Sequence, residues 1–296
     1  MRRESRGIRE PEILMRLALV AIAFLCLLPF ILIISGSLTS EAAIRTGGFR
    51  FVPQEWSVEA YRYLSSSFDQ IVSGYQISAI MTVGGTAIAL AVTALLAYPM
   101  SRKDLRFRGA LAIFAFITMV FHGGMVPWYI VLTRYLGLRD TILALILPYT
   151  ITAWNLFLLR NFLQTIPSEI HESAKMDGAG ELTIFLRMIL PLAKPGLATV
   201  GLFIALRYWN DWWLGLMLIN KEALYPLQLL LRRIVSNIQF LRNAPAEMTM
   251  INSSNLLPAE GVKMATTVVT IGPIVLLYPF VQRYFIKGLT VGAIKG

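Results

Sequence analysis

Apolar residues in this chain gather in long blocks instead of recurring at every second, third or fourth position. The blocks approach the roughly 20 residues that an α-helix needs to cross about 30 Å of hydrocarbon. Because that layer offers no water, the backbone N–H and C=O groups must pair within each segment. We therefore expect an all-α integral membrane protein. Its six transmembrane helices are predicted at about 13–36, 77–98, 109–131, 141–163, 196–219 and 263–287.

Composition supports this class. The 296 residues are 56% hydrophobic and only 15% charged, whereas soluble domains carry about 25% charged residues. The sequence shows no internal repeat and no low-complexity tract. Residues 1–296 are therefore expected to form a single transmembrane domain.

The net charge of +10 does not indicate nucleic acid, because the basic residues stand mainly at the ends of the apolar blocks. They are densest before the first block, in the 99–108 and 160–195 loops, and at the C-terminal end. The positive-inside rule then places both termini in the cytoplasm. The first block could also be a signal peptide, but it is longer than the ~7–15 apolar residues of such a segment. A retained helix is expected.

Few residues could carry chemistry. Cys26 is the single cysteine, and His122 and His171 show no ligand spacing, so neither a disulfide nor a metal site is expected. The sequence has no G-x-x-x-x-G-K-[ST] loop to hold nucleotide phosphates. We expect no catalytic residue and no cofactor in this chain, and an energy source in another polypeptide.

The inner segment 164–195 predicts a short capped helix, a glycine break and a second amphipathic helix. Ser168 is a suitable N-cap, and Glu172 is one of two glutamates that suit the positive end of the helix dipole. Gly178 and Gly180 are expected to stop this helix.

The first of these two helices has one narrow face. Ile170, Ala174 and Gly178 follow one another at intervals of four residues, so they share that face. Such a face is suited to docking into a groove on a partner protein. The second helix is expected to lie against the membrane or the bundle through its apolar residues Leu182, Phe185, Leu186 and Ile189.

This segment resembles a known motif. Glu172-Ser173-Ala174, then Asp177-Gly178-Ala179 and the downstream Ile189-Leu190-Pro191, resemble the EAA loop of binding-protein-dependent ABC importers, with Ser173 in place of an alanine. The resemblance implies a coupling helix at 168–178 that inserts in a cleft of a separate ATPase subunit. The coupling residues that it implies are Ile170, Glu172, Ser173, Ala174, Asp177, Gly178 and Ala179.

The same resemblance implies the type I ABC importer permease fold in the inner membrane of a bacterium. The implied partners are a second, similar permease in a heterodimer, two ATPase subunits that carry ATP and Mg²⁺, and an extracytoplasmic solute-binding protein. Membrane lipid surrounds the chain, and nucleic acid is not a partner. The run 122–127 and the C-terminal run 287–296 resemble the branch that includes lipoprotein-linked and alginate-type oligosaccharide importers. This implies a sugar or oligosaccharide as solute.

The predicted fifth span holds polar residues at a depth where charge is costly. By a rise of about 1.5 Å per residue, Asp211 lies about 22 Å from the start of its helix and His122 about 20 Å from the start of the third. One interpretation is that Trp209, Asn210, Asp211 and His122 border the solute pathway. The alternative is that Arg207 neutralises Asp211 along one helix face, and that His122 is a core residue beside a helix kink at Gly123-Gly124.

The outer segment 220–262 is predicted to be a long loop. The resemblance implies that it approaches the docked binding protein, and its polar run is Asn252, Ser253, Ser254 and Asn255. Two other functions stay open, an ion-coupled secondary transporter and a membrane-embedded glycosyltransferase. The first would favour internal repeats and a carboxylate pathway, and the second a carboxylate or metal constellation in an aqueous loop.

Overall fold

The computed structural model describes residues 10–243 and 258–271. All regular elements within this part of the chain are helical, and one isolated bridge joins Thr39 and Trp56. The α-helices are α1 (Glu10–Ser37), α2 (Glu41–Gly47), α3 (Glu59–Ser65), α4 (Phe68–Ser101), α5 (Arg108–Val120), α6 (Met125–Ile130), α7 (Ile142–Ile146), α8 (Ala153–Leu163), α9 (Ser168–Met176), α10 (Glu181–Ile184), α11 (Leu190–Leu192), α12 (Lys194–Trp209), α13 (Trp213–Leu218) and α14 (Leu227–Asn243). Residues 259–271 are also helical. Shorter π-helical segments are Val131–Tyr135 and Phe185–Ile189, and 3-10 turns are Leu147–Tyr149 and Glu222–Leu224.

The chain divides into two compact units. The first comprises the described parts of Met1–Phe68 and Arg233–Pro273. In it α1 keeps its apolar side chains exposed, as a helix in contact with lipid does. The buried carboxylate of Glu41 accepts hydrogen bonds from the amides of Glu260 (3.1 Å) and Gly261 (3.3 Å). These amides lie in the first turn of the helix at 259–271, where an anion satisfies otherwise unpaired donors.

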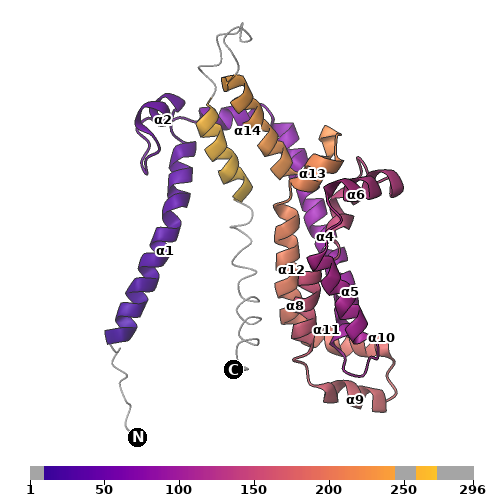
Figure 1. The fold of residues 1–296 in the computed structure, drawn as a ribbon. Helices are drawn as coiled ribbons and strands as arrows, with labels where there is room; N and C mark the ends of the chain where they lie inside the picture. The colour runs from indigo at the N-terminus through magenta and orange to yellow at the C-terminus, as the bar shows by residue number, and fades with distance from the viewer. Residues whose placement is uncertain (1–9, 244–257, 272–296) are drawn as a thin grey trace. The chain divides into compact units, whose positions relative to one another are not determined.

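The second unit comprises the described part of Asp69–Arg232. In it α4, α8 and α12 run side by side (Figure 1). Small residues let these helices approach closely: a Cβ added at Gly85 of α4 would lie 2.7 Å from the Tyr208 ring of α12. Likewise, Gly196 of α12 faces the Phe162 ring of α8, where an added Cβ would lie 2.5 Å away. Close contact through glycine is the usual way in which membrane helices pack.

Two helices are long and apolar enough to cross a membrane, Ile13–Ser37 and Phe68–Ser101, among the residues that the structure describes. Three further spans are formed if each of three bent helix pairs counts as one. The helix α4 begins nine residues before the predicted start at 77. The sixth predicted span, 263–287, is described only as far as residue 271, so the number of six and the side of the termini stay predictions.

Bends interrupt the predicted third and fourth spans, and a further bend lies directly before the predicted start of the fifth span at 196. The angle between α5 and the helix Met125–Tyr135 is 111°. It is 52° between Ile142–Tyr149 and α8, and 80° between Glu181–Leu192 and α12. The first bend lies at the predicted Gly123-Gly124 break, where Gly124 has φ 83°. That conformation is accessible to glycine at little cost.

The predicted outer loop 220–262 is wrong in one respect, because it contains the 17-residue helix α14. Leu227, Leu230 and Leu231 are buried, so an apolar stripe at intervals of three and four residues supports the helix. The amide of Leu227 donates to Ser78 Oγ at 2.9 Å, which joins the start of α14 to α4.

Candidate functional site

The helix α9 occupies the predicted coupling loop and ends in a complete glycine cap. Asp177 ends the helix, and Gly178 follows with φ 79°. The Gly178 amide donates to Lys175 O and the Ala179 amide to Ala174 O, each at 3.0 Å. This pair of bonds is the Schellman arrangement, which favours glycine at that position. The helix stop predicted at Gly178 is confirmed, whereas the predicted N-cap is not: Ser168 is the first helical residue and Pro167 precedes it.

The predicted docking face of α9 is covered in part by the chain itself, while its last residue, Gly178, is exposed. Ala174 is 1% exposed and Ile170 is half-buried. The face left open carries Glu172 and Ser173 together with Met176, which is 88% exposed. The small side chain of Ala174 therefore allows α9 to lie close to its own bundle, and the opposite face is the one available to a partner.

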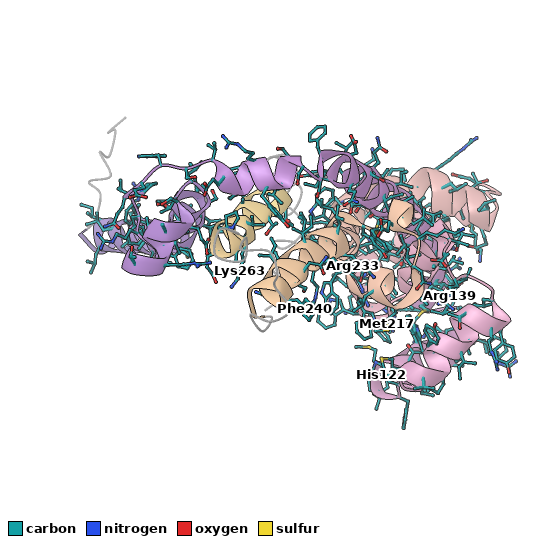
Figure 2. The ribbon with its side chains drawn as sticks, turned by 90° about the horizontal axis from the view of Figure 1, so that it is seen from above. His122, Arg139, Met217, Arg233, Phe240 and Lys263 are labelled. Atoms are coloured by element: carbon teal, nitrogen blue, oxygen red, sulfur yellow. The ribbon has the colours of Figure 1, made fainter. Side chains whose placement is uncertain are left out.

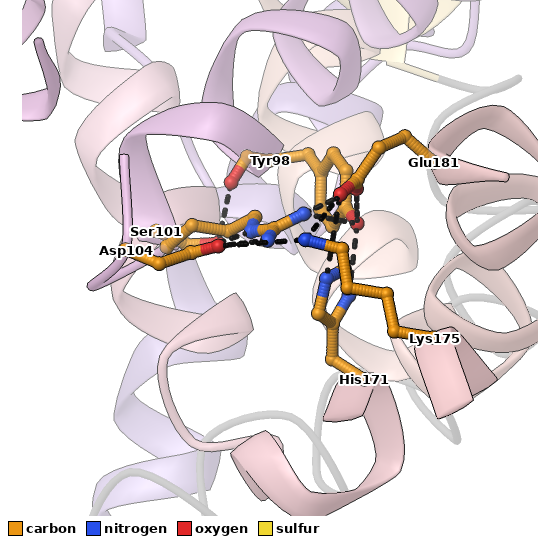
Figure 3. Close-up of polar contacts among 7 residues, drawn as sticks. Tyr98, Ser101, Asp104, His171, Lys175 and Glu181 are labelled. Atoms are coloured by element: carbon orange, nitrogen blue, oxygen red, sulfur yellow. Dashed lines mark hydrogen bonds and ion pairs between the residues drawn. The ribbon is translucent and has the colours of Figure 1, made fainter. Parts of the chain in front are cut away.

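A polar cluster holds α9 in this orientation (Figure 3). Its members come from the end of α4 and the loop after it, from α9, and from the first residue of α10: Tyr98, Arg102, Asp104, His171, Lys175 and Glu181. We call this set the Glu181 cluster.

Glu181 contacts most of the other members. Its Oε2 accepts a hydrogen bond from the Tyr98 hydroxyl at 3.2 Å and is paired with Arg102. Its Oε1 lies 3.2 Å from Lys175 Nζ. The Tyr98 hydroxyl also bonds His171 Nδ1 at 3.2 Å. Tyr98 packs its ring on Phe185, with centroids 5.0 Å apart, so the cluster continues into the apolar core.

Arg102 carries the charge on the α4 side of the cluster. Its side chain is only 14% exposed, yet it pairs with both Asp104 and Glu181. The hydrogen bond from Arg102 holds the pKa of the Asp104 carboxyl below its usual range. A buried guanidinium is costly unless carboxylates surround it, and planar Arg suits two such partners at once.

Sequence reasoning did not identify the Glu181 cluster. Arg102 and Lys175 entered the prediction only as basic residues of the 99–108 and 160–195 loops, and Glu181 follows Arg102 by 79 residues. No local pattern reports a pairing over such a separation, since it depends on how α4 and α10 pack.

The predicted pathway residues of the fifth span have a structural arrangement that neither interpretation anticipated. Asn210 ends α12 and α13 begins at Trp213, so Arg207 and Asp211 do not share a continuous helix. The Arg207 guanidinium instead stacks on Tyr149, 3.9 Å from the ring centre. Asp211 is 6% exposed and accepts hydrogen bonds from the Tyr149 hydroxyl (2.8 Å) and the Leu214 amide (3.0 Å).

Neighbouring residues differ from Asp211 in exposure. The Asn210 side chain is exposed and donates to Leu206 O at 2.8 Å. The Trp209 ring lies 6.3 Å from the Tyr75 ring, and its buried Nε1 has no hydrogen-bond partner in the described part of the chain. The predicted binding-protein contact at 252–255 lies outside the described residues.

His122 is separated from those residues and lines a pocket of its own. It lies exposed in the turn between α5 and α6 (Figure 2). The pocket measures about 620 Å³ and includes Phe121, Trp128 and Trp213 in its wall. The structure therefore brings His122 together with an aromatic residue of α13, and not with Asp211.

Comparison with known proteins agrees with this architecture. Residues 104–291 match the family described as binding-protein-dependent transport system inner membrane component. The polygalacturonan/rhamnogalacturonan transport system permease protein YtcP of Bacillus subtilis is 41% identical over 94% of this chain and 96% of its own. The trehalose transport system permease protein SugB of Mycobacterium tuberculosis is 30% identical over 91% of this chain and 93% of its own.

A solved structure is similar over nearly the whole length. It is a bacterial ABC transporter involved in the import of the acidic polysaccharide alginate, with a TM-score of 0.78, 31% identity, and coverage of 96% of this chain and 100% of that one. The bent spans and the helical loop at α9 thus occur in a chain whose sequence matches the family model over 104–291. The chain belongs to the family of inner membrane components of binding-protein-dependent transport systems.

Proposed function

We propose that this chain is a permease subunit of an ATP-driven importer for a sugar or oligosaccharide, working by alternating access. Its family membership and its relatives among oligosaccharide permeases support the solute class. The single observation that carries the coupling role is the placement of α9. It is fastened to the bundle on one side and exposes Glu172, Ser173 and Met176 on the other.

The energy comes from separate ATPase subunits in this proposal. They bind ATP and Mg²⁺, and the open face of α9 inserts in a cleft on one of them. The coupling residues are Ile170, Glu172, Ser173, Ala174, Asp177, Gly178 and Ala179. Ala174 and Gly178 act by shaping the helix, whereas Glu172 and Ser173 meet the ATPase. The further partners are a second, similar permease and an extracytoplasmic binding protein, in the cytoplasmic membrane of a bacterium.

Acidic oligosaccharides are the solutes we favour. YtcP is a polygalacturonan/rhamnogalacturonan permease, and the similar solved structure is a transporter involved in the import of the acidic polysaccharide alginate. The chain exposes cationic groups that suit carboxylates: Arg207 stacks on Tyr149, and Arg232 stacks on Trp212 at 3.6 Å from the ring centre. Stacking on a ring restrains each guanidinium without neutralising it.

The solute pathway is proposed to include the pocket at His122. Its volume of about 620 Å³ lies within the usual range for small ligands, and Trp128 and Trp213 supply flat apolar surfaces for sugar rings. Broken helices border cavities in other transporters, and the α5–α6 break borders this one. Asn210 is exposed and remains a candidate. Trp209 and Asp211 are assigned a supporting role, because Asp211 is occupied within the chain.

The proposal is tested by expressing a tagged form of the chain together with the proteins encoded by neighbouring genes, and purifying it through the tag. We expect a second permease and an ATPase to co-purify, and ATP hydrolysis to rise when the binding protein and an oligogalacturonate are added. His122→Ala and Trp213→Ala are expected to reduce this stimulation while the complex stays assembled. Purification of the chain without an ATPase, or ion-driven uptake by the chain alone, would contradict the assignment.

A further inference from the structure

The Glu181 cluster connects elements that the chain itself does not connect. A link of four residues, 177–180, joins α9 to α10, so these two helices are neighbours by sequence. Between α4 and α9 the chain passes through α5 to α8, and the cluster bridges the two directly. The Tyr98 hydroxyl to His171 Nδ1 bond at 3.2 Å joins α4 to α9, and the Tyr98 bond to Glu181 Oε2 joins α4 to α10.

The charged side chains of the cluster pair with one another, whereas the buried His171 Nε2 has no hydrogen-bond partner among the described residues. Two cations, Arg102 and Lys175, face two carboxylates, Asp104 and Glu181. His171 Nε2 lies 3.6 Å from Glu181 Oε1, which is within ion-pair distance when the imidazole is protonated. The cluster borders a pocket of about 520 Å³, but no cation is left over for an anionic ligand there. These side chains therefore serve to bind parts of the chain to one another.

Glu181 holds the central place in this connection. Its two oxygens divide their partners: Oε2 faces Tyr98 and Arg102 from α4 and the loop after it, while Oε1 faces Lys175 from α9. A single carboxylate thus lies between the two helices. Aspartate at this position would be shorter by one methylene, and glutamine would keep the shape but remove the charge.

We propose that Glu181 is a positioning residue that fastens α9 to the cytoplasmic end of α4, so that movement of α9 by the ATPase also moves α4. This rests on the proposed coupling role of α9. The ATPase contacts the open face of α9, and Glu181 acts on the opposite side. Loss of the Glu181 charge lets α9 follow the ATPase while α4 lags behind. ATP is then hydrolysed with less solute transported.

Coupling energies carried by such contacts correspond to changes of about twofold to about thirtyfold. We therefore expect Glu181→Gln and Arg102→Gln each to lower the amount of solute transported per ATP hydrolysed by a factor in this range. Co-purification of the ATPase and basal ATP hydrolysis should be retained, because the open face of α9 is unchanged. Tyr98→Phe, which removes only the hydroxyl and keeps the ring on Phe185, should give a smaller decrease.

The experiment uses the complete importer in proteoliposomes, with uptake of an oligogalacturonate and phosphate release measured in one preparation. The four proteins of a double-mutant cycle are wild type, Glu181→Gln, Arg102→Gln and the double variant. If the two residues act together, the double variant is no worse than the worse single variant, whereas independent effects multiply. Lys103→Gln is the matched control, since Lys103 is exposed and adjacent to Arg102.

The outcomes separate this inference from the proposed function. A wild-type complex that shows no ATP-dependent uptake contradicts the proposed function. The positioning role is overturned if wild-type uptake is normal and the solute transported per ATP hydrolysed is unchanged in Glu181→Gln and Arg102→Gln. It is also overturned if the effects of the two substitutions multiply in the double variant. If Glu181→Gln prevents assembly, Tyr98→Phe decides: a lowered ratio supports the role and a normal ratio overturns it.

Discussion

The Tyr149 hydroxyl donates a 2.8 Å hydrogen bond to Asp211, and the other oxygen of that carboxylate accepts from the Leu214 amide at 3.0 Å. This carboxylate lies at the break between α12 and α13. It binds the first turn of α13 on one side and the 3-10 turn that carries Tyr149 on the other. An acidic residue deep in a predicted span is here a helix cap with a tyrosine partner. Its role is to hold the broken helix in place.

Asp211→Ala is expected to lower the thermal stability of the purified chain. The substitution leaves the Tyr149 hydroxyl and the buried Leu214 amide without acceptors, at about 1–3 kcal/mol for each unpaired group. Asn210→Ala is the matched control, because its side chain is exposed and, among the described residues, donates to Leu206 O. Thermal unfolding in detergent should show a clearly lower melting temperature for Asp211→Ala and little change for Asn210→Ala. Equal changes would mean that the Asp211 hydrogen bonds do not stabilise the fold.

Thiol labelling should also distinguish these two positions. In a Cys26→Ala background, a charged thiol reagent should modify Asn210→Cys readily and Asp211→Cys slowly, since Asp211 is 6% exposed. Mass spectrometry of the intact chain measures the rates. Faster modification at 211 than at 210 would show that Asp211 faces water after all.

Close packing of α4 on α12 predicts a difference between adjacent glycines. Gly85→Ala would place a Cβ 2.7 Å from the Tyr208 ring, and Tyr208 is held by its hydrogen bond to Ile146 O at 2.7 Å. Such overpacking costs about 1–3 kcal/mol. Nothing lies within 4 Å of the corresponding Cβ at Gly84, so Gly84→Ala is the control. Thermal unfolding should separate the two variants, and equal stability would contradict the packing.

The cap of α9 predicts a similar contrast in coupling. Gly178 has φ 79°, where a Cβ costs about 1–2 kcal/mol, whereas Gly180 has φ −71° and tolerates one. Neither position has an atom within 4 Å of an added Cβ, so backbone strain alone distinguishes them. Gly178→Ala should weaken solute-stimulated ATP hydrolysis, and Gly178→Trp should abolish it or release the ATPase. Gly180→Ala should behave as wild type. Normal co-purification and stimulation in Gly178→Trp would contradict docking through α9.

The Asp104 ion pair has a predictable pH dependence. Because the Arg102 hydrogen bond lowers the pKa of the folded carboxyl, this pair stabilises the protein above the ordinary carboxyl pKa of about 4. The contribution is lost as pH falls through the lowered value. The melting temperature of Asp104→Asn should therefore lie below that of wild type by a constant amount from pH 8 to 5, and the gap should close below about pH 4. A gap that is already closed at pH 6 would contradict this.

The sequence predicted those features whose cause is local. Apolar blocks predicted the two long apolar helices α1 and α4, the Gly123-Gly124 pair predicted the α5–α6 bend, and Gly178 predicted the end of α9. The docking face of α9 stays a prediction, because a stripe of small residues suits burial against the same chain as well as against a partner. Only the position of the bundle decides between them, and Ala174 is buried there.

Features that depend on distant contacts were not predictable in this way. The predicted Arg207–Asp211 pair required an unbroken helix. In the structure the helix breaks before Asp211, and Asp211 accepts a hydrogen bond from Tyr149, which lies 62 residues away in the sequence. The Glu181 cluster likewise joins residues 79 apart. The 220–262 segment was predicted as a loop because it connects two apolar blocks. The amphipathic pattern of α14 lies within it and would have indicated the helix.

We propose that this chain conducts a sugar through the membrane at the expense of ATP hydrolysed by a separate subunit. Uptake of labelled oligogalacturonate into proteoliposomes that contain the chain, its partner permease, the ATPase and the binding protein tests it most directly. We predict uptake that requires ATP inside the vesicles, persists when ion gradients are dissipated, and disappears when the ATPase is omitted. Uptake that continues without the ATPase and follows an ion gradient would contradict the account.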